Sequence, residues 1–486
     1  MGNEEILSNR YRKFLLTGIW RTILTTSFSV LYVLYISRNI SFEIQDKMII
    51  LATAQLLIIK IALLGTSYSL VQQSQIRELS YNQINDIGFS IGVIMLPFVI
   101  IISVFSSYYV GLSLMNMILY VSMVIISFFF EIFCVVSNSK IENHKEIIIR
   151  TIYSILNSVL VASFLIYYQD ILMVLIAWIL SFLGSTLIFI KELYVLVFNS
   201  KIRISETINI IKFGAPIFML SIFNYLTNEI DKFLIYEFLA SGETAGYYWI
   251  SKFIIIFQQL ILNIIVGILP LFAVIVKRDT EEIFYEKINR IFRIGIFVSI
   301  VYFFTIIYQR ETIILLILSE LYLEYSELFF ILLLSAVFTI PNSILNNVFS
   351  SVGDRKKMII IGFVGALSKI IGILLFIRVG VIGFGYAILF QKIIGLILQY
   401  LLLGRKIELS GSVMRILLFG VLYIFVILIT PYNFSLEILY YQIIHIFALI
   451  VIFIIIKPLE LDDILFVMKI LNINPKYILK IKKYFR

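Results

Sequence analysis

The chain has 486 residues, of which 61% are hydrophobic and 14% are charged, with a mean hydropathy of +1.03. An ordinary soluble domain carries roughly 25% charged residues, so this composition excludes a soluble protein and predicts one that crosses a membrane many times. The single cysteine, Cys134, allows no intramolecular disulfide, and His144 and His445 lie too far apart in the sequence to indicate a zinc-type metal site.

Apolar stretches long enough to cross a bilayer recur along the whole chain. A helix needs about 20 apolar residues to span a hydrocarbon layer of roughly 30 Å. We therefore predict an all-α integral membrane protein with about 14 transmembrane helices. The predicted spans are 14–37, 48–72, 87–108, 113–135, 147–168, 171–190, 209–230, 247–275, 291–308, 327–350, 357–378, 380–403, 413–430 and 438–456.

The basic residues are distributed unequally between the two sides of these spans. With the N-terminus in the cytoplasm, 29 of the 39 Lys and Arg residues fall on the inner side and about five on the outer side. This bias predicts that both termini are cytoplasmic. It also accounts for most of the net charge of +9 without a nucleic-acid partner.

A weak internal repeat relates the two halves of the chain. The segment HKEIIIRTIYSILNSVLVASFLI (144–166) aligns without gaps to RKKMIIIGFVGALSKIIGILLFI (355–377). The copies open the fifth and eleventh spans, so their orientation in the membrane is the same. Transporters built from such parallel repeats bind their substrates between the two halves.

The sequence contains no catalytic signature. There is no GxSxG, no phosphate-binding loop, no HExxH and no glycine-rich nucleotide fingerprint, and the longest polar stretches have only about 20 residues. We therefore expect no enzyme activity and no bound cofactor. A membrane polymerase or glycosyltransferase is an alternative that product formation by the purified protein would support.

Basic side chains inside the predicted spans are the main candidates for a binding site. Such residues cost a few kcal/mol each and usually face a bundle interior or a watery cavity. The candidates are Arg21, Lys60, Lys252, Lys369 and Lys392. They outnumber the deep acids, so a cavity that they line would attract an anion. As alternatives, Lys252 could reach the interface, and Lys369 and Lys392 could pair with backbone carbonyls between helices.

Four prolines lie within or near the start of predicted spans. They are Pro97, Pro216, Pro270 and Pro341. A proline inside a helix removes one backbone hydrogen bond and kinks the helix. We predict that these positions are kinks that flex as a cavity opens, with static packing as the alternative.

Two stretches carry a resemblance to a known family. In 213–253 the elements are Pro216, the pair Asp231–Lys232 and the run Gly246-Tyr247-Tyr248; in 350–395 they are a Gly-Asp-Arg-Lys inner loop and a Gly-Val-Ile-Gly-Phe-Gly outer turn. Both stretches, with 318–334 between them, resemble the Wzx-like polysaccharide flippases of the multidrug/oligosaccharidyl-lipid/polysaccharide exporter superfamily. The first half departs from that pattern, because SFEIQDKM stands where a Tyr-Gly is expected.

The resemblance implies a fold and a function. It implies an N-terminal lobe (1–200, spans 1–6) and a C-terminal lobe (201–404, spans 7–12) around a central cavity, followed by two further spans and a basic cytoplasmic tail (405–486). The implied activity is alternating-access transport of polyprenyl-diphosphate-linked oligosaccharides across the bacterial cytoplasmic membrane, for O-antigen, capsule or exopolysaccharide synthesis. Membrane lipids and the polymerase or glycosyltransferases of the same pathway are the implied partners. The sequence does not identify the coupling ion, for which H⁺ and Na⁺ are the candidates.

The resemblance also assigns roles to residues. It makes Arg21, Lys60 and Lys252 the usual diphosphate contacts, with Lys369 and Lys392 as further candidates. Asn228, Glu229, Asp231 and Lys232 form a polar stripe near the outer mouth of the cavity, where we expect gating, sugar contact or ion coupling. Glu229 and Lys232 are three residues apart and can pair.

Two alternative functions belong to the same superfamily. A lipid II flippase would share the fold and the cationic cavity. A drug/cation antiporter would need buried carboxylates that exchange H⁺ or Na⁺ for a cationic drug, whereas the deep acids here are few and lie near span ends.

Overall fold

The computed structural model describes residues 25–256, 258, 281–307, 309–352 and 354–404, and a few single positions between 447 and 463. Within these ranges every regular element is a helix and no strand occurs. Residues 25–39 and 243–256 are also helical. The named elements are α2 (Phe42–Leu63), α3 (Thr66–Ile76), α4 (Tyr81–Tyr109), α5 (Leu114–Ser139), α6 (Asn143–Tyr167), α7 (Ile171–Thr186), η1 (Leu187–Phe189), α8 (Ile190–Phe198), α9 (Ile204–Phe238), α11 (Glu281–Ile307), α12 (Arg310–Ile317), η2 (Glu320–Tyr325), α13 (Ser326–Val352), α14 (Arg355–Phe376), η3 (Ile377–Val379) and α15 (Val381–Leu403).

Ten helical segments among the described residues are long and apolar enough to cross a membrane. They are Phe42–Ile76, Tyr81–Tyr109, Leu114–Ser139, His144–Tyr167, Ile171–Phe198, Ile204–Phe238, Ile288–Ile307, Glu320–Ser350, Lys356–Val379 and Val381–Leu403. Each coincides with a predicted span, so the predicted all-α membrane fold is confirmed. The number fourteen stays a prediction, because the spans at 14–37, 247–275, 413–430 and 438–456 lie wholly or partly outside the described residues.

The chain divides into two compact units. Unit 1 comprises Met1–Leu260, Ile313–Leu328 and Gly362–Ala387, and unit 2 comprises Ile261–Thr312, Phe329–Ile361 and Ile388–Arg486. The lobes implied by the family resemblance, 1–200 and 201–404, stay a prediction.

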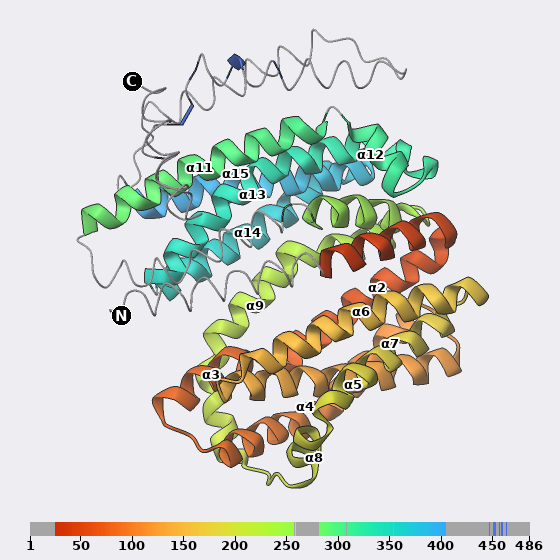
Figure 1. The fold of residues 1–486 in the computed structure, drawn as a ribbon, viewed down its shortest axis with the longest axis vertical. Coiled ribbons are helices and arrows are strands. Elements are labelled where there is room, and N and C mark those ends of the chain that lie inside the picture. Colours follow the sequence, from red (N-terminus) through yellow and green to blue (C-terminus); the bar gives the residue numbers. More distant parts are fainter. Residues whose placement is uncertain are drawn as a thin grey trace, which may run out of the picture. The chain divides into compact units, whose positions relative to one another are not determined.

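In unit 1, α4 packs against α5 and α6 packs against α7, and α5 also contacts α7 (Figure 1). The sequence defines where these helices start. Ser80 and Gln83 form a capping box at the start of α4, and the Ser113 hydroxyl accepts a hydrogen bond from the N–H of Asn116 at the start of α5. Such caps satisfy backbone N–H groups that have no partner inside the helix.

α2 and α9 make a close backbone contact at a pair of glycines. α2 stops at Leu64 and Gly65, which have left-handed backbone with φ of 46° and 74°, and α3 then continues the same span. A Cβ atom on Gly65 would lie 2.5 Å from the carbonyl oxygen of Gly214 in α9. Only glycine therefore permits both this interruption and this crossing.

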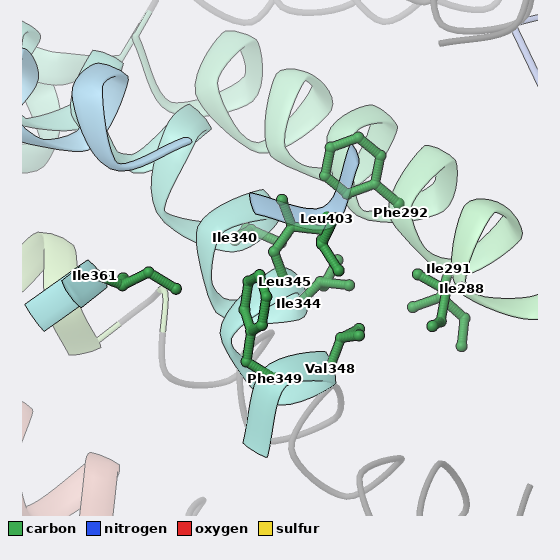
Figure 2. Close-up of a cluster of buried hydrophobic side chains, with 10 residues drawn as sticks. All are labelled: Ile288, Ile291, Phe292, Ile340, Ile344, Leu345, Val348, Phe349, Ile361 and Leu403. Carbon is green, nitrogen blue, oxygen red and sulfur yellow. The ribbon is translucent and has the colours of Figure 1, made fainter. Parts of the chain in front are cut away.

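A hydrophobic core cluster of unit 2 is formed by residues of α11, α13 and α14 and by the end of α15. Figure 2 shows its ten buried side chains: Ile288, Ile291, Phe292, Ile340, Ile344, Leu345, Val348, Phe349, Ile361 and Leu403. Gly295 in α11 leaves room for Ile344, whose Cδ1 lies 2.3 Å from the position of an added Cβ. The Asn342 side chain donates a hydrogen bond to the carbonyl oxygen of Lys392 at 2.9 Å, which ties α13 to α15.

Three of the four predicted kink prolines lie inside described helices. Pro97 is in α4, Pro216 in α9 and Pro341 in α13, and each helix continues on both sides of its proline. Pro270 lies outside the described residues. The role of these residues as flexible kinks stays a prediction.

We predict that Gly65→Ala destabilises the protein more than Gly111→Ala. Gly111 has a φ of 72°, so alanine at either position costs about 1–2 kcal/mol for left-handed backbone. An added Cβ at Gly111 has no heavy atom within 4 Å, whereas at Gly65 it collides with the α9 backbone. Thermal unfolding of the purified proteins in detergent should show the lower Tm for Gly65→Ala. Equal losses would contradict the α2–α9 contact.

Candidate functional site

Two oppositely charged side chains are buried between α9 and α14 in unit 1. Asp231 is 2% exposed and Lys369 is 1% exposed, and Lys369 Nζ lies 2.8 Å from Asp231 Oδ2. Lys369 Nζ also donates a hydrogen bond to the carbonyl oxygen of Thr227 at 2.6 Å. Inside a membrane span each of these charges would be costly without the other.

Further groups complete this cluster around Asp231. The Tyr247 hydroxyl donates a hydrogen bond to the Asp231 carboxylate, and the backbone N–H of Lys232 donates to Oδ1 at 3.0 Å. The Lys232 side chain pairs with Glu229, and its ammonium lies 5.6 Å from the centroid of the Tyr248 ring. With Lys369 included, two acids balance two bases, so the cluster presents no excess positive charge to an anion.

One ion pair predicted within the polar stripe on α9 is confirmed. Glu229 and Lys232 form the ion pair that their spacing indicates. Asn228 is exposed, and its side chain donates back to the carbonyl oxygen of Asn224 at 2.8 Å. Asp231 contacts Lys369, which lies 138 residues away in the sequence and which local spacing could not reveal. The roles of these residues in gating, sugar contact or ion coupling stay predictions.

Lys60 has a different environment. It lies in the last turn of α2, in the middle of the span predicted at 48–72, and its Nζ is 5.8 Å from the centroid of the Tyr225 ring. This distance is within the range of a cation–π attraction. Within the described part of the chain, the Lys60 ammonium has no ion pair and no hydrogen-bond acceptor. No described residue therefore occupies the N–H donors of this ammonium.

Tyr225 is held in place by the helix that carries Lys60. Its ring is 1% exposed, and its hydroxyl donates a hydrogen bond to the carbonyl oxygen of Thr53 in α2 at 3.0 Å. The aromatic face beneath Lys60 is thus fixed by burial and by a hydrogen bond. Nothing in the sequence indicated that Tyr225 lies next to Lys60, because the two residues are 165 positions apart.

The other predicted basic residues are placed as follows. Lys252 is partly buried in unit 1 and, like Lys60, has no ion pair or hydrogen bond among the described residues. Lys369 donates to a backbone carbonyl, as the alternative interpretation expected, and also to Asp231. Lys392 is partly buried in unit 2, and Arg21 lies outside the described residues. The diphosphate-binding role of all five stays a prediction.

Tyr247 belongs to this site. In the sequence it was noted only as part of the Gly246-Tyr247-Tyr248 motif. Gly246-Tyr247-Tyr248 carried the family resemblance, and the structure gives two of these residues direct contacts with the charged cluster. A hydroxyl aimed at a buried carboxylate satisfies one of its lone pairs and keeps the acid hydrogen-bonded. The motif was the only signal in the sequence for this contact.

We predict that breaking the buried ion pair destabilises the protein and that removing both charges restores it. Asp231→Asn or Lys369→Met alone should cost about 3–5 kcal/mol, because each leaves an uncompensated buried charge. The double variant should recover most of the loss in thermal unfolding of the purified protein. Glu43→Gln is the control, because it breaks the exposed pair of Glu43 with Lys47 and should have little effect. Additive losses in the double variant would contradict a direct pair.

Known proteins resemble this chain in sequence and in fold. Residues 48–327 match the profile of the family described as polysaccharide biosynthesis protein. The solved structure of lipid II flippase MurJ, in an inward closed conformation, has a TM-score of 0.70 and 17% identity, over 93% of this chain and 98% of that chain. No curated protein sequence matches the chain.

Transporters of the MATE family are also similar in structure. An inward-facing MATE transporter of the MOP superfamily has a TM-score of 0.61 and 14% identity, over 78% of this chain and 93% of that chain. An outward-facing one has a TM-score of 0.56 and 15% identity, over 81% and 95%. These identities establish the fold alone, whereas the family profile covers more than half of the chain. The resemblance found in the sequence is therefore confirmed: the chain belongs to the polysaccharide biosynthesis protein family and has the fold of the MOP-superfamily transporters.

Proposed function

We propose that this protein is a flippase for polyprenyl-diphosphate-linked oligosaccharides. It carries them by alternating access from the cytoplasmic to the outer leaflet of the bacterial cytoplasmic membrane, where they are used for a surface polysaccharide. Membership of the polysaccharide biosynthesis family and the fold shared with MurJ and MATE transporters support this proposal. Such a cargo carries a diphosphate, which needs cationic donors within the membrane.

The observation that carries the proposal is the unpaired ammonium of Lys60. Lys369 and Lys232 are neutralised by neighbouring acids, whereas Lys60 lies near the face of Tyr225 and has no acid partner among the described residues. A phosphate oxygen that reached this ammonium would accept a charge-assisted hydrogen bond from a donor that no protein acid has already occupied. Lys252, also unpaired among the described residues, is the second candidate on unit 1.

The environment of Asp231 favours a flippase over a drug/cation antiporter. An antiporter needs a buried carboxylate that is free to exchange H⁺ or Na⁺ for a cationic drug. The Asp231 carboxylate instead accepts hydrogen bonds from Lys369 and Tyr247. The ion that would drive transport, H⁺ or Na⁺, stays a prediction.

Replacing Arg21 and Lys60 together by alanine should abolish the surface polysaccharide without lowering the amount of protein in the membrane. Lys60→Ala alone should reduce export about 10- to 100-fold, because a hydrogen bond to a charged group contributes about 1.5–3 kcal/mol. The measurement is the surface polysaccharide of a strain that depends on the plasmid-borne gene, relative to the membrane abundance of each variant.

Lys47→Ala is the matched control for this experiment. Lys47 lies on the same helix as Lys60, but it pairs with Glu43 at the outer end. Its replacement should leave export unchanged. Normal export by the Arg21/Lys60 double variant would show that these cations do not bind the cargo.

Complementation separates this function from that of a lipid II flippase. We expect no growth rescue when the protein is expressed in a strain depleted of its own lipid II flippase. Rescue would instead show that the protein transports lipid II, whose diphosphate would bind Lys60 in the same way.

A further inference from the structure

One short segment, residues 38–46, joins the outer ends of several helices of unit 1. The predicted topology places it in the outer loop between the first two spans, within the predicted N-terminal lobe. Its contacts reach 242–249 and 315–322, in the predicted C-terminal lobe. We propose that Arg38, Gln45 and Asp46 form a lock that keeps the outer end of the transport path closed until the cargo is released outward. The lock rests on the proposed function for its purpose, but its geometry can be tested without transport.

Asp46 binds the start of a helix that begins at Glu243. The carboxylate is 3% exposed; its Oδ2 accepts a hydrogen bond from the N–H of Gly242 at 2.7 Å, and its Oδ1 accepts one from the N–H of Ala245 at 2.8 Å. The first N–H groups of a helix have no partner within it, and the positive end of the helix dipole favours an anion. A residue of α2 therefore supplies the cap of a helix almost 200 residues further along the chain.

Gln45 uses both ends of its side-chain amide. It is 1% exposed, and its Oε1 accepts hydrogen bonds from the indole N–H of Trp249 and from the Tyr322 hydroxyl, the latter at 2.9 Å. Its Nε2 donates to the carbonyl oxygens of Ile40 and Ile36, at 2.6 and 3.3 Å. Separating these segments would leave buried donors without acceptors until water entered.

Arg38 binds the opposite kind of helix end. Its Nε donates to the carbonyl oxygen of Leu318 at 2.6 Å, and its Nη2 donates to those of Leu316 and Leu315 at 2.5 and 2.9 Å. Leu315 and Leu316 lie in the last turn of α12 and Leu318 directly follows it, so these carbonyls lie at the negative end of the helix dipole. The lock thus places an acid at one helix N-terminus and a base at another helix C-terminus.

The closed outer end also buries polar groups that lack partners. The hydroxyl oxygens of Ser37, Thr244 and Ser319 are buried without a hydrogen bond in the part of the chain that the structure describes. Glu243 Oε2 is also buried without a hydrogen bond among the described residues, and burial raises the pKa of this carboxyl. Water would reach these groups if the outer end opened, so they favour opening while the lock bonds oppose it. Because these two contributions to the free energy oppose each other, the closed and open states of the outer end can interconvert.

The geometry of α2 suits this movement. A cavity of about 290 Å³ adjoins the lock, lined by Glu43, Asp46, Lys47, Tyr236, Ala240 and Ser241. Further along α2, the crossing of Gly65 and Gly214 is a direct backbone contact. The outer end of α2 therefore borders existing space, and the backbone contact with α9 lies further along the span.

Thiol labelling of the purified protein tests the lock. The native Cys134 is 1% exposed and reports unfolding, and Thr244→Cys introduces a second thiol at a position that is 1% exposed beside the lock. We expect Asp46→Asn to raise the labelling rate of the introduced thiol by a polar maleimide about tenfold or more. The reason is that an asparagine oxygen can accept from one of the two helix N–H groups, while its NH₂ opposes the other. Cys134 should stay protected.

Glu43→Gln is the matched control, since Glu43 is an acid on the same helix that is exposed and paired with Lys47. It should leave the labelling rate unchanged, and an equal rate for Asp46→Asn would overturn the lock. If Asp46→Asn also exposes Cys134, the Arg38→Gln variant is tested in its place. Faster labelling of the introduced thiol in Arg38→Gln, with Cys134 still protected, supports the lock. An unchanged labelling rate in Arg38→Gln overturns it. Labelling as expected in a protein that exports no polysaccharide in cells would count against the proposed function and leave the lock standing.

Discussion

A charge inside a membrane must be neutralised by a partner, reach water or meet a ligand, because the hydrocarbon interior stabilises no isolated ion. This constraint separates the basic residues of unit 1 into two groups. Lys369 and Lys232 are neutralised by Asp231 and Glu229, which makes them parts of a balanced cluster. Lys60 has an aromatic face and no acid among the described residues. The proposed function gives this mid-span cation a ligand, the diphosphate of the cargo.

The packing of α2 against α9 connects the features that matter for transport. Thr53 contacts Tyr225 and Gly65 contacts Gly214, so the two helices run in opposite directions along each other. Lys60 lies between these two contacts in the sequence, and the lock residue Asp46 lies beyond them toward the outer side. One membrane span, Phe42–Ile76, therefore carries the cationic side chain, the tight crossing and part of the outer closure.

Features that depend on local periodicity could be predicted from the sequence. Apolar run length indicated the spans, and the spacing of Glu229 and Lys232 indicated their ion pair. Features that depend on distant partners could not. The ion pair of Lys369 could not be foreseen because its acid lies 138 residues away, and neither could the contact of Gly65 with Gly214 in a remote helix. The outer segment SFEIQDKM looked like a departure from the family pattern, whereas its Gln45 and Asp46 are buried in contacts with remote segments.

The central claim, that an unpaired mid-span cation moves a lipid-linked diphosphate, is tested most directly in proteoliposomes. Vesicles containing polyprenyl-diphosphate-linked oligosaccharide in both leaflets are treated with a glycosidase that cannot cross the membrane, with and without the reconstituted protein. We predict that the wild-type protein makes the inner-leaflet oligosaccharide accessible to the enzyme, and that a folded Lys60→Gln protein does so about 10- to 100-fold more slowly. Equal exposure of the oligosaccharide by the wild-type and Lys60→Gln proteins would contradict the account.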